Sequence, residues 1–260
     1  MRILITNDDG IYAPGLALME RIAKTLSEDI FIVAPEHDQS GVAHSLTIND
    51  PLRLRKISER HFAVKGTPTD CIIMGVRKLL GGARPELVLC GVNNGQNVAD
   101  DLMYSGTVAG AMEAASLGLP AIALSQAYGP IGREESFWEC AEMHAPRLIA
   151  RILEAGIPQY SVINVNFPAC PPDAVQGIAV SAQGRRDVQA AIIDERADGR
   201  GNPYYWISFA RSSSAPGRGT DLEALAQNKI SVTPLKLDLN DETGRARLEL
   251  SFCQLKLNCL

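Results

Sequence analysis

The sequence predicts an α/β protein with a doubly wound, mostly parallel, Rossmann-like sheet, an inserted β-hairpin and an extended arm in its C-terminal part. Short apolar runs alternate with stretches of helical periodicity, which is the pattern of parallel strands connected by helices. A polar loop follows each of the early runs, where such a strand ends. We therefore expect an α/β core at 1–182, followed at 183–260 by an extended arm, a short helix and C-terminal strands that complete the core.

Four short apolar runs in the first half of the chain are candidate strands. They span residues 3–5, 30–34, 87–90 and 121–124. Candidate helices span residues 16–26, 68–80 and 108–117. Thr67 followed by Pro68 marks the start of the second helix. Two short alternating segments around Ser58 and Glu59 predict a β-hairpin inserted between the parallel units.

The second half of the chain is less regular. Candidate strands lie at residues 162–165, 178–181 and 230–233, and candidate helices lie at 136–154 and 220–228. Residues 184–203 are rich in charge and glycine without an apolar period, so we expect an exposed arm or an oligomer contact there. The aromatic segment 204–209 is typical of a packed strand or an interface.

The C-terminal segment alternates between apolar and polar residues. Leu248, Leu250 and Phe252 recur at every second position, which predicts a strand over residues 247–257. The alternating leucines at 235–239 would form its partner strand.

The composition excludes several functional classes. The 260 residues carry a formal net charge of -5 and contain no run of lysine or arginine, so we expect no binding to nucleic-acid polymers. No apolar span has the length of a membrane helix, so we expect no membrane partner. The chain starts with a predicted core strand rather than a secretory signal, which favours a cytoplasmic location. The six cysteines lack C-x-x-C spacing, which favours reduced thiols over a zinc site.

The residues Asn7, Asp8, Asp9 and Gly10 follow the first predicted strand. Two adjacent carboxylates at the end of a buried strand repel each other, and a cation would compensate them. A polar turn, with Asn7 as its cap and Gly10 in a left-handed conformation, explains the same residues equally well. This stretch alone therefore leaves a metal site and a capped turn as equal alternatives.

Later loops favour the metal site. In a doubly wound sheet, ligands bind outside the carboxyl ends of the strands, where the polar loops after the second and third strands also lie. These loops carry Ser40 and Asn93, whose oxygens suit a hard cation. The next helix begins near Ser105, Gly106 and Thr107, and free backbone N–H groups at a helix start bind anions. The combination predicts metal-assisted phosphate chemistry.

Five sequence motifs stand in a characteristic order. They read N-D-D-G-I-Y-A-P-G, A-P-E-H-D-Q-S-G, G-T-P-T-D-C, G-V-N-N-G-Q-N and Y-S-G-T-V. The chain therefore resembles the SurE family, whose members are divalent-metal-dependent phosphatases acting on nucleoside monophosphates. The resemblance is dense over residues 1–125 and looser afterwards. It implies a 5′-nucleotidase with a nucleotide as its small-molecule substrate.

The resemblance also implies roles for individual residues. Asp8 and Asp9 would be the catalytic acidic residues, and together with Ser40 and Asn93 they would bind one Mg²⁺ or Mn²⁺ ion. Asn97, Ser105, Gly106 and Thr107 would bind the phosphate. The segment 184–209 would form a hairpin arm that contributes to a homodimer or homotetramer. Related chains commonly end in a helix, whereas the alternation at 247–257 predicts a strand.

We hypothesise that a metal-activated water attacks the phosphorus atom while donors at the predicted helix start stabilise the phosphate oxygens. A covalent route through Asp8 is the alternative. The sequence leaves open the preferred base and whether 3′-monophosphates or short polyphosphate are also cleaved.

Two other protein classes also place acidic residues after a first strand. A receiver-like signalling domain requires a phosphate-accepting aspartate after the third strand of its sheet, where this chain has Asn93. A haloacid-dehalogenase-type phosphatase separates its two acidic residues by one position, and Gly10 occupies the place of the second one. Both classes therefore fit the sequence less well than a SurE-like phosphatase.

Overall fold

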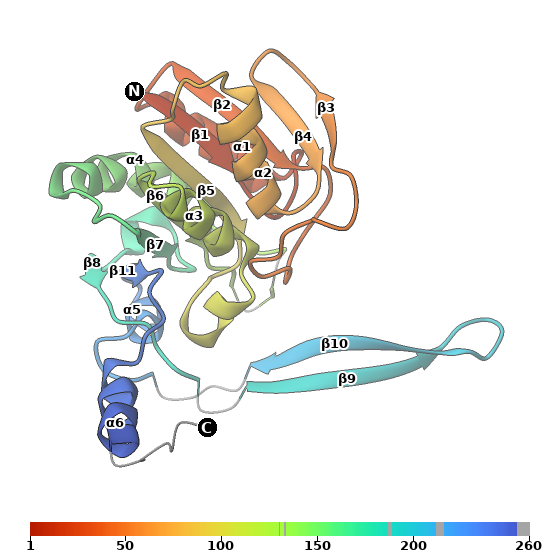
Figure 1. Cartoon of the computed structure of the whole chain (residues 1–260), viewed down its shortest axis with the longest axis vertical. Coiled ribbons are helices and arrows are strands. Elements are labelled where there is room, and N and C mark those ends of the chain that lie inside the picture. Colours follow the sequence, from red (N-terminus) through yellow and green to blue (C-terminus); the bar gives the residue numbers. More distant parts are fainter. Residues whose placement is uncertain (130, 133, 187–188, 212–215, 254–260) are drawn as a thin grey trace, which may run out of the picture.

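The computed structural model describes residues 1–129, 131–132, 134–186, 189–211 and 216–253. In these residues nine strands form one sheet in the order β3-β4-β2-β1-β5-β6-β7-β11-β8 (Figure 1). Its centre consists of the parallel strands β2 (Asp29–Pro35), β1 (Arg2–Thr6), β5 (Leu87–Asn94), β6 (Ala121–Gln126) and β7 (Ser161–Phe167). The strand order reverses at β1, which is the predicted doubly wound topology.

Shorter strands complete both edges of the sheet. On one side β4 (His61–Lys65) runs parallel to β2, and β3 (Arg53–Lys56) runs antiparallel to β4. This pair confirms the predicted hairpin. On the other side β11 (Ile230–Lys236) runs antiparallel to β7, and β8 (Ile178–Val180) runs parallel to β11.

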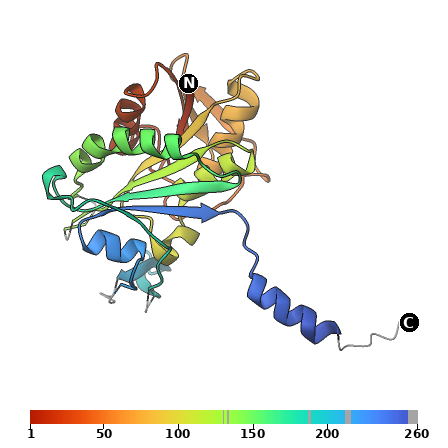
Figure 2. The same ribbon diagram turned by 90° about the vertical axis from the view of Figure 1, so that its left-hand side faces the viewer.

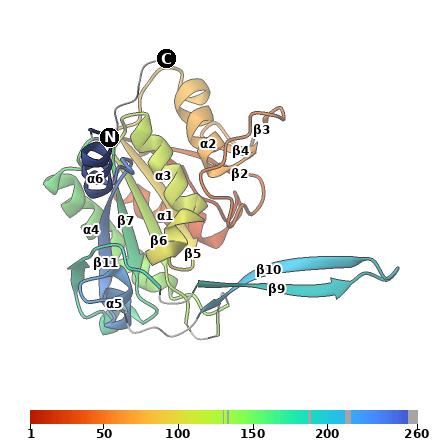
Figure 3. The same cartoon turned by 60° about the horizontal axis from the view of Figure 1, so that its bottom comes forward.

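Helices cover both faces of the sheet. On one face, α1 (Pro14–Lys24) and α4 (Trp138–Ala155) pack with Ile3 and Ile5 of β1. On the other, α2 (Pro68–Met74), its π-helical continuation η1 (Gly75–Leu79) and α3 (Gly106–Ser116) pack with Leu4. Figure 3 shows α2 and α3 side by side. Successive residues of β1 enter opposite cores, which explains why the strand is an unbroken apolar run.

The predicted helix caps are present. Thr67 Oγ1 accepts a hydrogen bond from Asp70 N at 3.2 Å, while Asp70 Oδ2 accepts one from Thr67 N at 2.8 Å. Ser105 Oγ accepts from Val108 N at 3.1 Å and caps α3. Because the cap fixes where α3 begins, the first N–H groups of the helix belong to Gly106 and Thr107.

A long hairpin extends from the core (Figures 1 and 3). It consists of β9 (Gln189–Ala197) and β10 (Pro203–Arg211), which pair antiparallel in a separate two-stranded sheet. Trp206 is 60% exposed, and its neighbours Tyr205 and Ile207 are exposed as well. The hairpin confirms the predicted exposed arm over residues 192–203. Earlier in the predicted segment, Gly184 and Arg186 bind Asp221 and Asp101 instead, and residues 187–188 lie outside the described ranges. The oligomer contact stays a prediction.

The C-terminal segment corrects one prediction. After the short helix α5 (Asp221–Ala226) and strand β11, helix α6 (Glu242–Cys253) replaces the strand predicted at 247–257. Residues 254–257 of that strand lie outside the described ranges. Leu235, in the expected partner segment, pairs with Val162 of β7 instead. Arg245 forms ion pairs with residues three positions before and four positions after it, which stabilise a helix.

Helix α6 extends away from the sheet (Figure 2). Its alternating apolar side chains are exposed. The alternation that predicted a strand therefore does not correspond to one buried face. The family resemblance, which implied a C-terminal helix, agrees with the structure. Within the described ranges, none of the helices combines the length and apolar character needed to cross a membrane.

Candidate active site

The loop after β1 forms a tight turn at the C-terminal end of the strand. Asn7 Nδ2 donates a hydrogen bond to Gly10 O at 2.9 Å, and Gly10 has a φ of 105°. Only glycine adopts this backbone conformation without strain. The capped turn considered from the sequence is therefore present, and it holds Asp8 and Asp9 at the edge of the sheet. Turn and metal site are compatible rather than exclusive.

Asp8 lies against the start of α3. The residue is 4% exposed, and Thr107 Oγ1 donates a hydrogen bond to Asp8 Oδ1. A Cβ atom on Gly106 would lie 2.8 Å from the Cβ of Asp8, so this close approach requires glycine. The carboxyl group is thus adjacent to the positive end of an 11-residue helix.

The surroundings of Asp8 disfavour its charged form. Burial is the main reason why the pKa of Asp8 rises from 3.8 to about 7, and repulsion by the Asp9 carboxylate raises it further. The Thr107 hydrogen bond lowers the pKa and offsets part of this rise, while Asp38 adds a weaker repulsion. The carboxylates of Asp9 and Asp38 therefore both disfavour a charge on Asp8.

Asp9 contacts the end of β5. Asn94 N donates a hydrogen bond to Asp9 Oδ2 at 3.1 Å. The preceding residue, Asn93, donates from Nδ2 to Gly95 O at 2.7 Å. Because the amide nitrogen of Asn93 is used in this way, its Oδ1 is the atom available as a ligand.

A bulge in β5 places these asparagines. The pairing of β5 with β6 shifts in register between Cys90 and Asn93, and it resumes with Asn93 opposite Ser125. Gly91, inside the bulge, has a φ of 124°, and a Cβ atom there would lie 2.2 Å from Leu124 O. Bulges of this kind redirect the side chains that follow them.

The loop after β2 brings Ser40 to the same edge. Gln39 N donates a hydrogen bond to the backbone oxygen of Asp8 at 2.8 Å. Ser40 is exposed, and its N and Oγ both donate to Asp38 Oδ1, at 2.7 and 2.6 Å. Since the hydroxyl proton of Ser40 points to Asp38, the oxygen can present a lone pair to a cation.

Asn97 occupies a buried position next to the site. Its Nδ2 donates to Ser125 Oγ at 2.9 Å, and its backbone oxygen accepts from the side chains of Asn164 and Asn166, at 2.8 and 3.0 Å. These bonds join the loop after β5 to strands β6 and β7. Direct contact between Asn97 and a phosphate stays a prediction.

Sequence reasoning missed three polar residues that support the site. Asn164 and Asn166 stand two positions apart in the otherwise apolar strand β7, and this spacing places them on one face. Asp38 precedes Ser40 by two residues, a spacing typical of an Asx-type turn. Both signals are visible in the sequence.

The oxygen donors at this edge fit a hard divalent cation. Asp8 and Asp9 provide carboxylate oxygens, Asn93 an amide oxygen and Ser40 a hydroxyl, which is a donor set suited to Mg²⁺ or Mn²⁺. Among the residues that the structure describes, no three His, Cys, Asp or Glu side chains gather into a metal-binding group. A cation here would thus rely on amide and hydroxyl oxygens besides two carboxylates, and it would relieve the repulsion that raises the pKa of Asp8.

Comparison with known proteins agrees with this geometry. The family model described as "Survival protein SurE" matches residues 3–190. The chain belongs to the SurE family. Membership of this family rules against the receiver-like and haloacid-dehalogenase-type alternatives.

Individual SurE proteins resemble this chain over nearly its whole length. A protein of Methylocella silvestris named 5′-nucleotidase SurE is 68% identical over 241 residues, which are 93% of this chain and 95% of the relative. Its namesake in Beijerinckia indica is 64% identical and covers 97% of both chains. The crystal structure of the SurE protein from Aquifex aeolicus superimposes with a TM-score of 0.83 at 37% identity, covering 96% of this chain and 99% of that one.

Proposed function

We propose that this chain is a divalent-metal-dependent 5′-nucleotidase, which hydrolyses nucleoside 5′-monophosphates to nucleoside and phosphate. One observation carries the proposal: the carboxyl group of Asp8 lies against Gly106 and Thr107 at the start of α3. The contact joins acidic groups suited to a cation with backbone donors suited to an anion. Metal-assisted hydrolysis of a phosphomonoester uses both at one place, and the names of the relatives support the same activity.

In this proposal the start of α3 binds the phosphate. The side chain of Ser105 caps the N–H group of Val108, so we assign the N–H groups of Gly106 and Thr107 to the substrate. As the bond between phosphorus and the nucleoside oxygen breaks, these donors and the helix dipole stabilise the charge on the phosphate oxygens.

Asp8, Asp9, Ser40 and Asn93 would hold one Mg²⁺ or Mn²⁺ ion. Bound there, the ion would polarise the phosphate and provide a nucleophilic water at neutral pH. Asp38 orients Ser40 through two hydrogen bonds, and the N–H group of Asn94 orients Asp9. Groups in this second layer keep metal ligands in place.

We propose attack on phosphorus by water rather than by Asp8. Asp8 is almost fully buried, its Oδ1 accepts the hydrogen bond of Thr107, and Gly106 packs on its Cβ. A phosphoryl group on Asp8 would have to displace these contacts. Trapping a phosphorylated protein that is sensitive to hydroxylamine would contradict the water mechanism.

The test of the proposed function is a substrate panel. Purified protein is incubated with 5′- and 3′-nucleoside monophosphates and with short polyphosphate, each with Mg²⁺, Mn²⁺ or EDTA, and released phosphate is measured. We expect metal-dependent release from the 5′-monophosphates. The same panel decides whether 3′-monophosphates and polyphosphate are also cleaved. No release from any nucleotide with either metal would contradict the proposal.

A further inference from the structure

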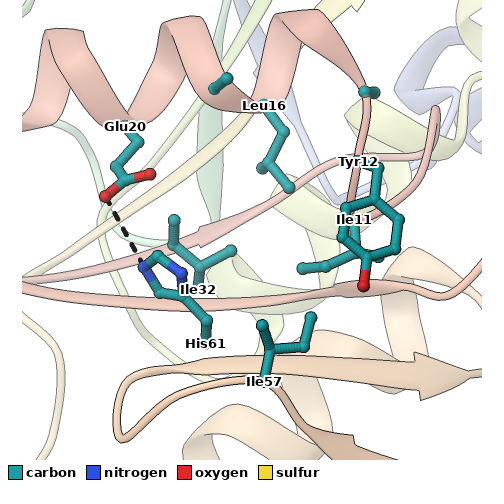
Figure 4. A pocket seen from close by; sticks show the side chains of 9 residues that line it. Ile11, Tyr12, Leu16, Glu20, Ile32, Ile57 and His61 are labelled. Carbon is teal, nitrogen blue, oxygen red and sulfur yellow. Dashed lines mark ion pairs between the residues drawn. The ribbon is translucent and has the colours of Figure 1, made fainter.

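A cavity of about 260 Å³ lies between α1, β2 and the β3–β4 hairpin (Figure 4). Its walls are mostly apolar and include Ile11, Leu16, Ile32 and Ile57. Figure 4 shows Tyr12 at one end and the pair Glu20 and His61 at the other. The cavity is therefore an apolar slot with a polar end.

The slot begins close to the candidate active site. Asp9 and Ile11 are separated only by Gly10, whose left-handed backbone turns the chain between them. Ile11 N then donates to Pro35 O at 2.8 Å, which fixes this part of the loop over the end of β2. One short loop thus carries the predicted metal ligands at its start and a wall of the slot at its end.

Tyr12 presents an aromatic ring at the mouth of the slot. The residue is 73% exposed, although it lies three residues from Asp9. Arg55 Nη1 donates to the Tyr12 hydroxyl at 3.1 Å, and the Arg55 guanidinium lies 5.7 Å from the ring centre. Arg55 Nε in turn donates a hydrogen bond to Glu36 Oε1 at 2.9 Å. These contacts orient the ring, and stacking on such rings is a common way to bind nucleobases.

The polar end of the slot offers an acceptor and a donor. His61 Nε2 lies 3.6 Å from Glu20 Oε1, which is longer than a hydrogen bond. Lys24 Nζ also contacts Oε1 of Glu20, at 2.7 Å. Because both contacts involve the same oxygen, Glu20 Oε2 can accept a hydrogen bond from a ligand. The His61 ring nitrogen can donate one beside it.

We propose that this slot binds the purine base of the nucleoside 5′-monophosphate whose phosphate lies at the start of α3. This inference rests on the proposed function. The slot is smaller than the roughly 300–1,000 Å³ of drug-sized ligand sites, so it accommodates a ring system rather than a whole nucleotide. A purine places a hydrogen-bond donor next to an acceptor on its edge, which complements Glu20 and His61.

The size of the base follows from the length of the slot. Leu16 and Glu20 both line the slot and stand four residues apart on α1, which corresponds to a rise of roughly 6 Å along the helix. A base that enters beside Tyr12 must span much of this distance to reach Glu20. The two fused rings of a purine reach further than the single ring of a pyrimidine, so we expect purine nucleotides to be preferred.

The experiment compares kcat/KM for AMP and GMP with that for ribose 5-phosphate, which lacks the base. In Glu20→Gln we expect kcat/KM for the purine nucleotides, relative to that for ribose 5-phosphate, to fall about tenfold. Lys24 holds the remaining side-chain oxygen, and the NH₂ group that takes the place of Oε2 cannot accept a hydrogen bond. Ile57→Trp, which fills the slot with a larger ring, should lower the same ratio. Glu28→Gln, a change of an exposed residue just after α1, should leave it unchanged.

A photolabel gives a readout independent of turnover. We expect 8-azido-AMP to label the peptides that contain Tyr12 or Ile57, and excess AMP to suppress the labelling. Labelling of other peptides, or an unchanged substrate ratio in both Glu20→Gln and Ile57→Trp, would overturn the inference. If AMP is still hydrolysed, those outcomes do not contradict the proposed function. The proposed function itself would be refuted if the protein hydrolysed no phosphomonoester.

Discussion

In the metal-free protein, the surroundings of Asp8 disfavour the charged form of its carboxyl group. Its pKa of about 7 lies above the value of 3.8 that it has when unfolded, so this group stabilises the metal-free fold fully below about pH 4. That contribution is lost as the pH rises through 7. A pKa difference of this size corresponds to about 4 kcal/mol.

We therefore predict that the metal-free protein becomes less stable between pH 5 and pH 8, and that Asp8→Asn removes much of this loss. The amide has a similar shape but no charge, so at pH 8 we expect Asp8→Asn to be more stable than the unchanged protein by about 1–3 kcal/mol in EDTA. Urea denaturation at the two pH values measures this difference. Equal pH dependence in both proteins would contradict the assignment of the raised pKa.

Gly106 is the second residue whose substitution should disrupt the candidate site. We predict that Gly106→Ala lowers kcat at least about 100-fold, because the added methyl group lies within 2.8 Å of Asp8 Cβ and separates the carboxyl group from the helix start. Phosphate release from AMP measures the loss. Gly199→Ala is the matched control, since a Cβ atom there meets no atom within 4 Å. Equal activity of the two variants would show that the contact is unimportant.

Elements with a clear apolar period were predictable from the sequence, and elements that depend on distant contacts were not. The strands beginning at Arg2 and Asp29 are buried on both faces, so their apolar runs identified them. The bulge at Gly91 depends on the close approach of Leu124 O, which no local pattern encodes. The alternation of Leu248 and Leu250 predicted a strand, but their side chains are exposed and do not pack on a sheet. This segment forms a helix instead, in line with helix propensity.

The same distinction holds for the candidate site. Asp8, Asp9 and the start of α3 were recognisable because each follows directly from a strand end or a helix cap. The role of Asp38 requires the fold of its loop, which orients Ser40. The burial of Asn97 depends on strands more than sixty residues away in the sequence.

A buried aspartate connects the base of the arm to the loop after β5. Asp221, at the start of α5, accepts hydrogen bonds from the backbone N–H groups of Ala99, Gly184 and Leu222, at 2.9, 2.8 and 2.8 Å. We predict that Asp221→Asn destabilises the protein by about 1–3 kcal/mol, since the amide NH₂ faces a backbone donor. Urea denaturation measures the change, and a variant as stable as the unchanged protein would contradict it.

At the scale of the whole molecule, we propose that the arm joins copies of the chain into a homodimer or homotetramer. A two-stranded hairpin is marginally stable on its own, and this one carries exposed aromatic side chains, including Trp206. We predict that replacing residues 189–211 with a short Gly-Ser linker yields monomers with an intact core. Sedimentation velocity measures the oligomeric state, and an unchanged state would assign the contact to another surface, such as α6.

The central claim is that Asp8 and Asp9 bind a divalent cation beside a phosphate held by the start of α3. Anomalous diffraction from crystals grown with Mn²⁺ and phosphate tests it most directly. We expect one strong manganese peak in contact with oxygens of Asp8 and Asp9, with the phosphate at the N–H groups of Gly106 and Thr107. A manganese peak away from both aspartates, or a phosphate bound elsewhere, would contradict the claim.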